Sequence, residues 1–407
     1  MGATSGAPGV ECHRGRGGLT RVIYLDNSAT TMRKPPQVLA AVADAMTHSG
    51  NSGRGGHGAS LETGRALFAT RAKAARLFRA VGPDHAVFTA NASAALNTAI
   101  AGLLRPGDHA VSTDLEHNSV LRPLHAASQR GVEVTIVESS DGVVDVGHVT
   151  DALRTNTAAV VMTHGSNVLG TVQPIEQIAA LSRVRGFWLI VDAAQTAGLL
   201  PISMGDGYAA VCCAGHKSLL GPQGTGLLVL GEGVLPTPLL FGGTGFETFN
   251  RSMPGRLPEA LEAGTQNGPG IAGLGAGVQV VLDAGGAEGP TTMWRTAMDR
   301  ARQLREGLAA TGSFSFAPID MGAWRLPIVA GNLIDPSGAL MDSEVVAARL
   351  WELGEIAVRG GFHCAPLVHE RYGTTTVGMV RFSPGHDTTV EDIETTLAVL
   401  AGIQRSG

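Results

Sequence analysis

Charged residues are scarce in this chain. Only 16% of its 407 residues are Asp, Glu, Lys or Arg, and 44% are apolar, whereas charged residues usually make up about 25% of a globular protein. This balance excludes a disordered or fibrous chain and is typical of a well-buried globular protein. A basic excess is also absent, since the net charge is −5. We therefore expect neither nucleic acid nor an anionic lipid surface among its partners.

Long apolar runs and a disulfide pattern are absent as well. No segment reaches the roughly 18 consecutive apolar residues of a membrane span. Residues 1–20 are Gly-rich and polar and have no apolar core of a secretory signal, so we interpret them as a flexible leader. The four cysteines include the adjacent pair Cys212 and Cys213, a poor basis for a disulfide framework. A cytoplasmic location, where thiols stay reduced, fits this pattern.

Short apolar runs alternate with stretches of helical length through the middle of the chain. Most runs are rich in β-branched residues and do not alternate with polar ones, which is typical of strands buried on both faces. Their alternation with helices predicts an α/β fold with a mostly parallel seven-stranded sheet. The predicted strands are Ala86–Thr89, His109–Ser112, Val132–Glu138, Ala158–Thr163, Phe187–Val191, Ala209–Cys213 and Gly226–Leu230. Helices are predicted between them at Ser93–Leu104, Val120–Arg130 and Ile175–Arg185.

The pattern changes near residue 286 and predicts a smaller α+β domain. The Gly-rich stretch Ala284–Pro290 is the expected boundary, which gives a leader at 1–20, a large domain at 21–285 and a small domain at 286–407. The first residues after the leader are free to pack on the small domain. A capping box at Thr388–Glu391 predicts the start of the last helix, with Val390, Ile393, Leu397 and Leu400 on one face. The other predicted elements are helices at Trp294–Thr311 and Ser343–Leu353 and strands at Ser313–Phe316, Trp324–Val329, Ile356–Arg359 and Met379–Phe382.

Two predicted strands end in chemically complementary residues. Asp192 and Gln195 follow one strand, and His216 and Lys217 follow the next. Side chains at the carboxyl ends of adjacent strands reach one crevice in such a sheet. An acid and an amine meeting there suit pyridoxal phosphate, because the lysine forms a Schiff base while the acid holds the pyridine nitrogen protonated. The alternatives are a helix-capping carboxylate and a solvated lysine.

Further polar residues follow the neighbouring strands. Ala92 and Ser93 begin a predicted helix whose amides would bind a phosphate, although the turn is also an ordinary N-cap. His117 would stack on the cofactor ring and move protons, or is simply a loop residue. Asn167 would hydrogen-bond the cofactor or shape a turn. No metal site is predicted.

The small domain contributes a second pair of candidates. Arg359 ends a predicted strand and offers a fork that suits a substrate carboxylate. Cys364 follows in a loop bounded by Gly and Pro, unlike Cys212 and Cys213, which lie in an apolar run. We therefore expect Cys364 to be the exposed thiol.

Taken together, the chain resembles the class V aminotransferase-like (fold type I) pyridoxal phosphate enzymes, specifically the cysteine desulfurase and selenocysteine lyase group. The resemblance runs from Tyr24 to the C-terminal helix. It departs from the family pattern at Ala94 and Ala214, where many members carry Glu and a hydroxyl residue, so one phosphate contact is expected to be missing or replaced. The matching motifs are Tyr24–Thr31, Asn51–His57, Glu116–Asn118, Ser166–Thr171, Asp192–Gln195, Gly215–Lys217, Glu262–Thr265 and Arg359–Ala365.

The resemblance implies a role for each candidate. Lys217 is implied to be the Schiff-base lysine, Asp192 the partner of the pyridine nitrogen, and Cys364 the residue that accepts sulfur. Arg359 would hold the substrate carboxylate, together with Asn167. The remaining cofactor contacts would come from Gln195, Asn167, His117, Ser93, Ala92 and His216, and from Thr265 of a second subunit in a homodimer.

The implied activity is a cysteine desulfurase. It would convert L-cysteine to L-alanine and leave a persulfide on Cys364 for a sulfur-acceptor protein, in iron–sulfur cluster or thio-cofactor biosynthesis. Lys217 would take the Cα proton, and His117 would move protons to or from the substrate. The alternatives are a selenocysteine lyase or another C–S lyase on the same fold, and a non-catalytic scaffold or sulfur-carrier partner.

Overall fold

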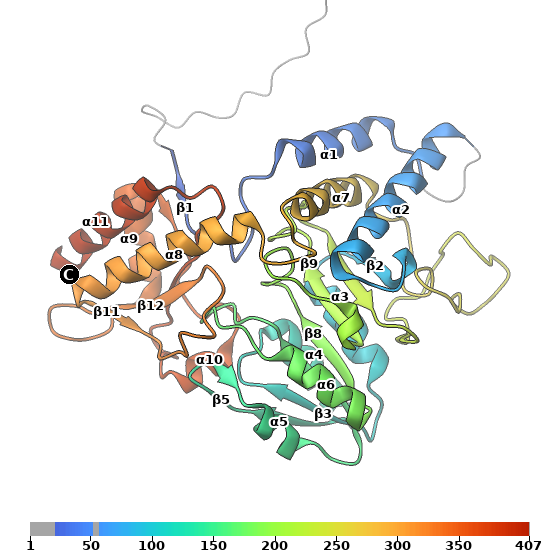
Figure 1. Cartoon of the computed structure of the whole chain (residues 1–407), viewed down its shortest axis with the longest axis horizontal. Coiled ribbons are helices and arrows are strands. Elements are labelled where there is room, and N and C mark those ends of the chain that lie inside the picture. The colour runs from blue at the N-terminus through green and yellow to red at the C-terminus, as the bar shows by residue number, and fades with distance from the viewer. Residues whose placement is uncertain (1–20, 52–56, 407) are drawn as a thin grey trace, which may run out of the picture.

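A twisted sheet flanked by helices forms the larger part of the molecule, and a smaller lobe lies beside it (Figure 1). The computed structural model describes residues 21–51 and 57–406. The expected leader and the middle of the Asn51–His57 motif lie outside these residues.

The central sheet has seven strands in the order β2-β10-β9-β8-β7-β3-β4. Strand β10 runs antiparallel to both its neighbours, β2 and β9, and the other pairs are parallel. All seven predicted strands are confirmed, with ends shifted by at most one residue. Their bounds are β2 Ala86–Thr89, β3 His109–Thr113, β4 Glu133–Val137, β7 Thr157–Thr163, β8 Trp188–Asp192, β9 Ala210–Ala214 and β10 Gly226–Leu230. A separate short pair is formed by β5 Ser139–Ser140 and β6 Val143–Val144.

The inner strands are buried on both faces, which explains their uninterrupted apolar runs. Val160 and Met162 of β7 face one core with α2 (Gly58–Phe78), α6 (Ile175–Arg185) and α7 (Gly268–Asp283). Ala159 and Val161 face the opposite core, which is closed by α3 and α4. The remaining helices here are α1 Pro36–His48, α3 Ala92–Leu103, α4 Asn118–Ser128 and α5 Val146–Ala152, with 3₁₀ turns at Pro83–His85 and Met204–Asp206.

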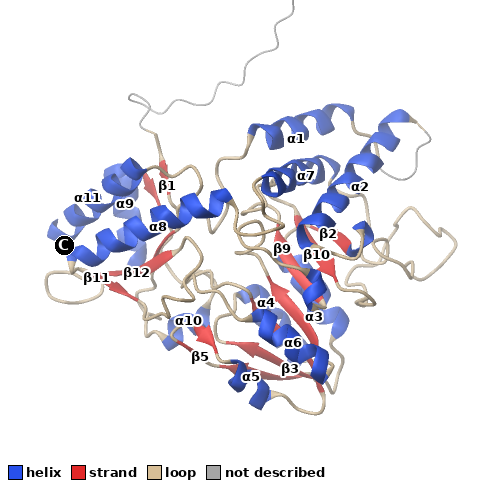
Figure 2. Ribbon diagram, in the orientation of Figure 1, coloured by secondary structure: helices blue, strands red, loops and turns tan. Residues whose placement is uncertain are grey.

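The smaller lobe packs three helices against a three-stranded antiparallel sheet in the order β11-β12-β14 (Figure 2). Its elements are α8 Thr292–Thr311, β11 Phe314–Phe316, β12 Val329–Leu333, α9 Ser343–Gly354, β13 Ile356–Ala357, α10 Pro366–Arg371, β14 Val380–Phe382 and α11 Val390–Ser406. Strand β1 (Ile23–Tyr24), from the start of the described chain, pairs in parallel with β13. Among the helices of the described residues, none is long and apolar enough to cross a membrane.

One predicted strand is misplaced. The segment Trp324–Val329 is mostly loop, and the strand β12 begins only at Val329. The backbone before it is held by distant partners instead of a neighbouring strand, since the amides of Arg325 and Leu326 both donate to the carbonyl of Gly170. The apolar content of residues 324–329 therefore placed this strand too early along the chain.

The capping box of the last helix is also shifted by one residue. The hydroxyl of Thr389 accepts the amide of Asp392, and the Asp392 carboxylate accepts the amide of Thr389. Thr388 instead closes the preceding turn by accepting the Gly385 amide. Val390 is 42% exposed, Leu397 is partly buried, and Ile393 and Leu400 are buried as predicted.

The loop between α7 and α8 separates two packing groups. Helix α7 packs on α1 and α2, whereas α8 packs on α11 and on the strands β11 and β12. We propose that the chain divides here into domains at 21–285 and 286–407, with β1 packed on the second.

Candidate active site

A cavity of about 220 Å³ lies at the carboxyl ends of the parallel strands. The structure brings most of the predicted site residues together there because each follows the end of a neighbouring strand or lies in the facing loop of the small lobe. The predicted residues that line it are Ala92, Ser93, His117, Asn167, Asp192, Gln195, His216, Lys217 and Arg359. Cys364 lies in the adjoining loop, and Thr265 lies elsewhere on the surface of the large lobe.

The backbone between β9 and Lys217 is closely packed at Gly215. A Cβ atom at Gly215 would lie 2.2 Å from the Thr225 hydroxyl oxygen, so only glycine fits there. The backbone carbonyls of His216 and Lys217 accept hydrogen bonds from side chains near the start of the described residues. The hydroxyl of Thr31 donates to the Lys217 carbonyl at 2.8 Å, and the Lys34 amine donates to the His216 carbonyl at 2.7 Å. The backbone that positions the Lys217 amine is thus fixed by the close packing at Gly215 and by the hydrogen bonds from Thr31 and Lys34.

Lys217 and Asp192 carry opposite charges in the same cavity, where Asp192 is buried and Lys217 is partly buried. Burial lowers the pKa of Lys217 to about 8, although the Asp192 carboxylate opposes that shift. Burial also raises the pKa of Asp192, against the opposing effects of the Ala194 amide and of Lys217. An amine with such a pKa is partly unprotonated near neutral pH and is therefore available as a nucleophile.

The start of α3 forms the opposite end of the cavity. The side chain of Asn91 caps the helix by accepting the Ala94 amide at 2.9 Å. The amides of Ala92 and Ser93 belong to the first helical turn, where no intrahelical acceptor is available. The Ser93 hydroxyl lies 2.6 Å from that of Ser119, which also lines the cavity. Amides at a helix start beside a hydroxyl are groups that suit an anion.

His117 caps α4 and has a defined tautomer. Its Nδ1 accepts the backbone N–H of Ser119 at 3.0 Å, so the ring proton of the neutral imidazole is on Nε2. Burial lowers the pKa of His117 to about 4, and the positive charges of Lys217 and Arg359 add to this effect. The ring is therefore neutral near pH 7, which suits stacking on an aromatic ligand.

Asn167 and Gln195 use part of their hydrogen-bonding capacity to hold the site together. The Asn167 amide donates to the His363 carbonyl at 2.8 Å, which ties the cavity to the loop of Cys364. The Gln195 amide donates to the Ser28 carbonyl at 3.1 Å. The side-chain oxygens of both residues have no hydrogen-bond donor among the described residues.

Two arginines bring positive charge to the small-lobe side of the cavity. Arg359 was predicted, and its guanidinium has no hydrogen-bond or ion-pair partner within the part of the chain that is described. Arg381 was missed, although it is only 1% exposed and lines the same cavity. It binds the Asp26 carboxylate at 2.8 Å and the Asn167 carbonyl at 3.1 Å. The sequence could have indicated Arg381, because a charged residue between apolar residues of a predicted strand requires a buried partner.

Cys364 is exposed, as predicted, whereas Cys212 and Cys213 are buried in β9. His363 and Cys364 both have positive φ angles, 50° and 55°, which side chains rarely adopt. The loop is held in this conformation by the Asn118 amide, which donates to the Cys364 carbonyl at 2.7 Å. The thiol therefore sits on a constrained loop beside the start of α4.

The Glu262–Thr265 motif lies away from the cavity. Glu262 forms a buried, two-pronged ion pair with Arg71 of α2, at 2.7 and 2.5 Å. Thr265 lines surface pockets at the outer side of the large lobe. Within one chain, Thr265 does not reach the cavity.

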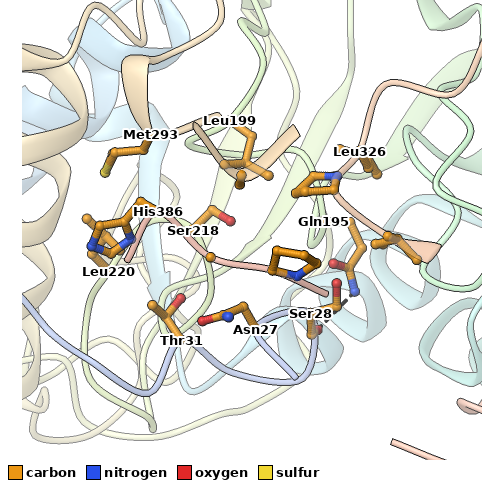
Figure 3. A pocket seen from close by; sticks show the side chains of 15 residues that line it. Asn27, Ser28, Thr31, Gln195, Leu199, Ser218, Leu220, Met293, Leu326 and His386 are labelled. Carbon is orange, nitrogen blue, oxygen red and sulfur yellow. Dashed lines mark hydrogen bonds between the residues drawn. The ribbon is translucent and has the colours of Figure 1, made fainter. Parts of the chain in front are cut away.

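A smaller cavity of about 50 Å³ adjoins the first and shares Ser28 and Gln195 with it (Figure 3). His386 is its single titratable lining residue, and no acid or amine faces it. Of these two cavities, the first one therefore holds the acid and the amine. The labelled apolar side chains around the smaller one are Leu199, Leu220, Met293 and Leu326.

The larger cavity fits pyridoxal phosphate in its donor chemistry. Asp192 is only 5% exposed, and its Oδ2 has no hydrogen-bond partner among the described residues. A buried carboxylate with an unpaired oxygen requires a donor such as a protonated pyridine nitrogen. The Lys217 amine lines the same space, and the amides and hydroxyl at the start of α3 suit the phosphate.

Comparison with known proteins agrees with this geometry. The model of the class-V aminotransferase family matches residues 23–396. A probable cysteine desulfurase of Methanothermobacter thermautotrophicus is 34% identical, over 94% of this chain and 95% of that protein. A cysteine desulfurase of Cereibacter sphaeroides is 31% identical, over 94% of this chain and 95% of that protein. The apo structure of the cysteine desulfurase from Thermococcus onnurineus superposes with a TM-score of 0.85 at 27% identity, covering 95% of each chain. The chain belongs to the class-V aminotransferase family and has the fold type I architecture of its pyridoxal phosphate enzymes.

Proposed function

We propose that the protein is a cysteine desulfurase that uses pyridoxal phosphate to convert L-cysteine to L-alanine and leaves the sulfur as a persulfide on Cys364. The observation that carries this proposal is that Lys217 and Asp192 line one cavity together with Arg359, which is unpaired among the described residues, next to an exposed thiol. The relatives named as cysteine desulfurases match along nearly the whole chain and support the same activity.

The cavity residues would divide the binding of pyridoxal phosphate among them. Lys217 provides the amine that attaches the cofactor, and Asp192 binds the pyridine nitrogen. His117 stacks on the ring. When bound, the cofactor supplies an electron sink for negative charge at the substrate Cα. The remaining contacts are Gln195 and Asn167 at the O3′ side, and Ala92, Ser93, His216 and the second subunit's copy of Thr265 at the phosphate.

The substrate would be oriented by Arg359 and deprotonated by Lys217. The Arg359 guanidinium binds the cysteine carboxylate through two parallel hydrogen bonds, with Asn167 beside it. The Lys217 amine, once the substrate amino group has taken its place, would be a free base whose pKa burial lowers to about 8, and it would take the Cα proton. His117 keeps a proton on Nε2 and offers it as a hydrogen-bond donor.

Sulfur transfer would occur at Cys364. Its thiolate forms a bond to the substrate sulfur while the bond between that sulfur and Cβ breaks, and the carbon fragment is protonated and leaves as alanine. The overall balance is L-cysteine plus a thiol giving L-alanine plus a persulfide, so no external oxidant is needed. The exposed position of Cys364 lets a sulfur-acceptor protein approach. The free thiol suits a cytoplasmic location.

Replacement of Cys364 tests the proposal directly. We expect Cys364→Ala to lose most of its alanine formation from L-cysteine, while Cys212→Ala, which removes a buried thiol of β9, keeps it. Alanine and sulfide are measured under reductant, and selenocysteine and cystine are compared as substrates. Unchanged alanine release by Cys364→Ala would refute the persulfide route, and turnover of selenocysteine alone would replace the proposed substrate.

A further inference from the structure

The phosphate end of the cavity contains a hydroxyl that none of the family motifs indicated. Ser119 lies in the first turn of α4 and lines the cavity together with Ser93. Ala214, where many family members carry a hydroxyl residue, lines the same cavity without a side-chain donor. Ser119 is thus a further hydroxyl in a cavity that lacks one hydroxyl of the family pattern.

The hydrogen bonds of Ser119 determine where its hydroxyl proton goes. Its oxygen lies 2.6 Å from the Ser93 hydroxyl and 2.9 Å from His117 Nδ1. The single lone pair of Nδ1 already accepts the backbone N–H of Ser119 at 3.0 Å. The Ser119 hydroxyl proton can therefore go either to His117 Nδ1, as a second donor beside the backbone N–H, or to Ser93, and in the second case the Ser93 hydroxyl proton is available to an acceptor in the cavity.

An anion at the start of α3 would fix this direction. A phosphate dianion only accepts hydrogen bonds, so Ser93 would donate to it, and the Ser93 oxygen would then be free to accept a hydrogen bond from another hydroxyl. Ser119 is the hydroxyl at the required distance. We propose that Ser119 is a positioning residue of the phosphate site, which orients the Ser93 hydroxyl toward the cofactor phosphate and connects that site to His117.

The inference rests on the proposed function in that it takes a phosphorylated cofactor as the ligand. Loss of one neutral hydrogen bond that orients a charged one corresponds to about a five- to tenfold loss of affinity. We therefore expect the Kd of the cofactor-free protein for pyridoxal phosphate to rise by about five- to tenfold in Ser119→Ala. Pyridoxal lacks the phosphate, and its Kd should stay within about twofold of the wild-type value.

The experiment is equilibrium dialysis of the cofactor-free, full-length protein with pyridoxal phosphate and with pyridoxal, followed by absorbance. Ser119→Thr keeps the hydroxyl and should retain wild-type affinity. Ser128→Ala removes a hydroxyl from the last turn of the same helix, where it bonds only the His125 carbonyl, and serves as the matched control. Circular dichroism verifies that each variant is folded.

The outcomes separate the two proposals. A selective loss for pyridoxal phosphate, restored by Ser119→Thr, supports the role of Ser119. Equal losses for both ligands, or no loss for either, overturn that role and leave the proposed function standing. Failure of the wild-type protein to bind pyridoxal phosphate overturns both.

Discussion

The buried ion pair between Arg71 and Glu262 allows a quantitative prediction for Glu262→Gln. The two side chains are only 8% and 7% exposed. Glu262 accepts two hydrogen bonds from Arg71 and a third from the Phe88 amide at 2.7 Å. A glutamine keeps at most two of these, because its amide nitrogen must face a guanidinium nitrogen, and it leaves the Arg71 charge without a counter-charge.

Removal of one partner of a buried pair costs about 3–5 kcal/mol. Arg71 keeps the Ala86 carbonyl at 2.6 Å and the ring of Phe88 at 4.2 Å, so we expect the lower end, about 3 kcal/mol. The same change at Glu288 is the control, because its 2.9 Å pair with Arg79 is exposed and is worth at most about 1 kcal/mol.

The assay is equilibrium urea unfolding of the cofactor-free protein at fixed concentration, with the free energy of unfolding taken from the midpoint and slope. Equal losses in Glu262→Gln and Glu288→Gln would refute the reasoning. Because Glu262 begins the turn that carries Thr265, a confirmed loss would also show that this turn is anchored through α2.

Three further predictions concern the titrating and substrate-binding groups. Burial raises the pKa of Glu116 to about 8, above its unfolded value, so its contribution to stability is present below about pH 4.5 and is lost as the pH rises to 8. Glu116→Gln should remove this pH dependence of the free energy of unfolding, measured from about pH 5 to about pH 9. An unchanged pH dependence would contradict the raised pKa. The Lys217 amine of the cofactor-free protein should react with an amine reagent with an apparent pKa near 8, measured by mass spectrometry across pH, whereas reaction only above about pH 10 would exclude the lowered pKa. Arg359→Lys should raise the KM for L-cysteine about tenfold or more because the fork is lost, with kcat less affected, and an unchanged KM in steady-state assays would remove Arg359 from carboxylate binding.

The central sheet of the large lobe could be predicted because its inner strands are buried on both faces. Val160 and Met162 contact one core and Ala159 and Val161 the other, so the residues between Thr157 and Thr163 are all apolar and mark the strand. Once the strands were located, the rule that carboxyl ends meet at one edge brought Asp192 and Lys217 together. For these strands and for the position of Asp192 and Lys217, the local sequence pattern was sufficient.

The parts that could not be predicted depend on contacts between distant segments. Trp324 lies in an apolar run, yet its backbone pairs with Thr171 in a single bridge and forms no strand. Arg381 is neutralised by Asp26, which is 355 positions away, and no local pattern indicates such a partner. The role of Ser119 depends on a hydroxyl of another helix, at Ser93.

The site is complete only when the first described residues contact segments of the small lobe. Strand β1 pairs with β13, and Asp26 binds Arg381, while Thr31 and Lys34 hold the carbonyls next to the nucleophilic amine. During synthesis, the amino-terminal strand is made first, but its pairing partner leaves the ribosome more than three hundred residues later. The segment that fixes the amine is thus anchored only after residues 356–357 have been synthesised. A nascent or C-terminally truncated chain would have the sheet without a correctly held lysine, and such chains would be released without activity.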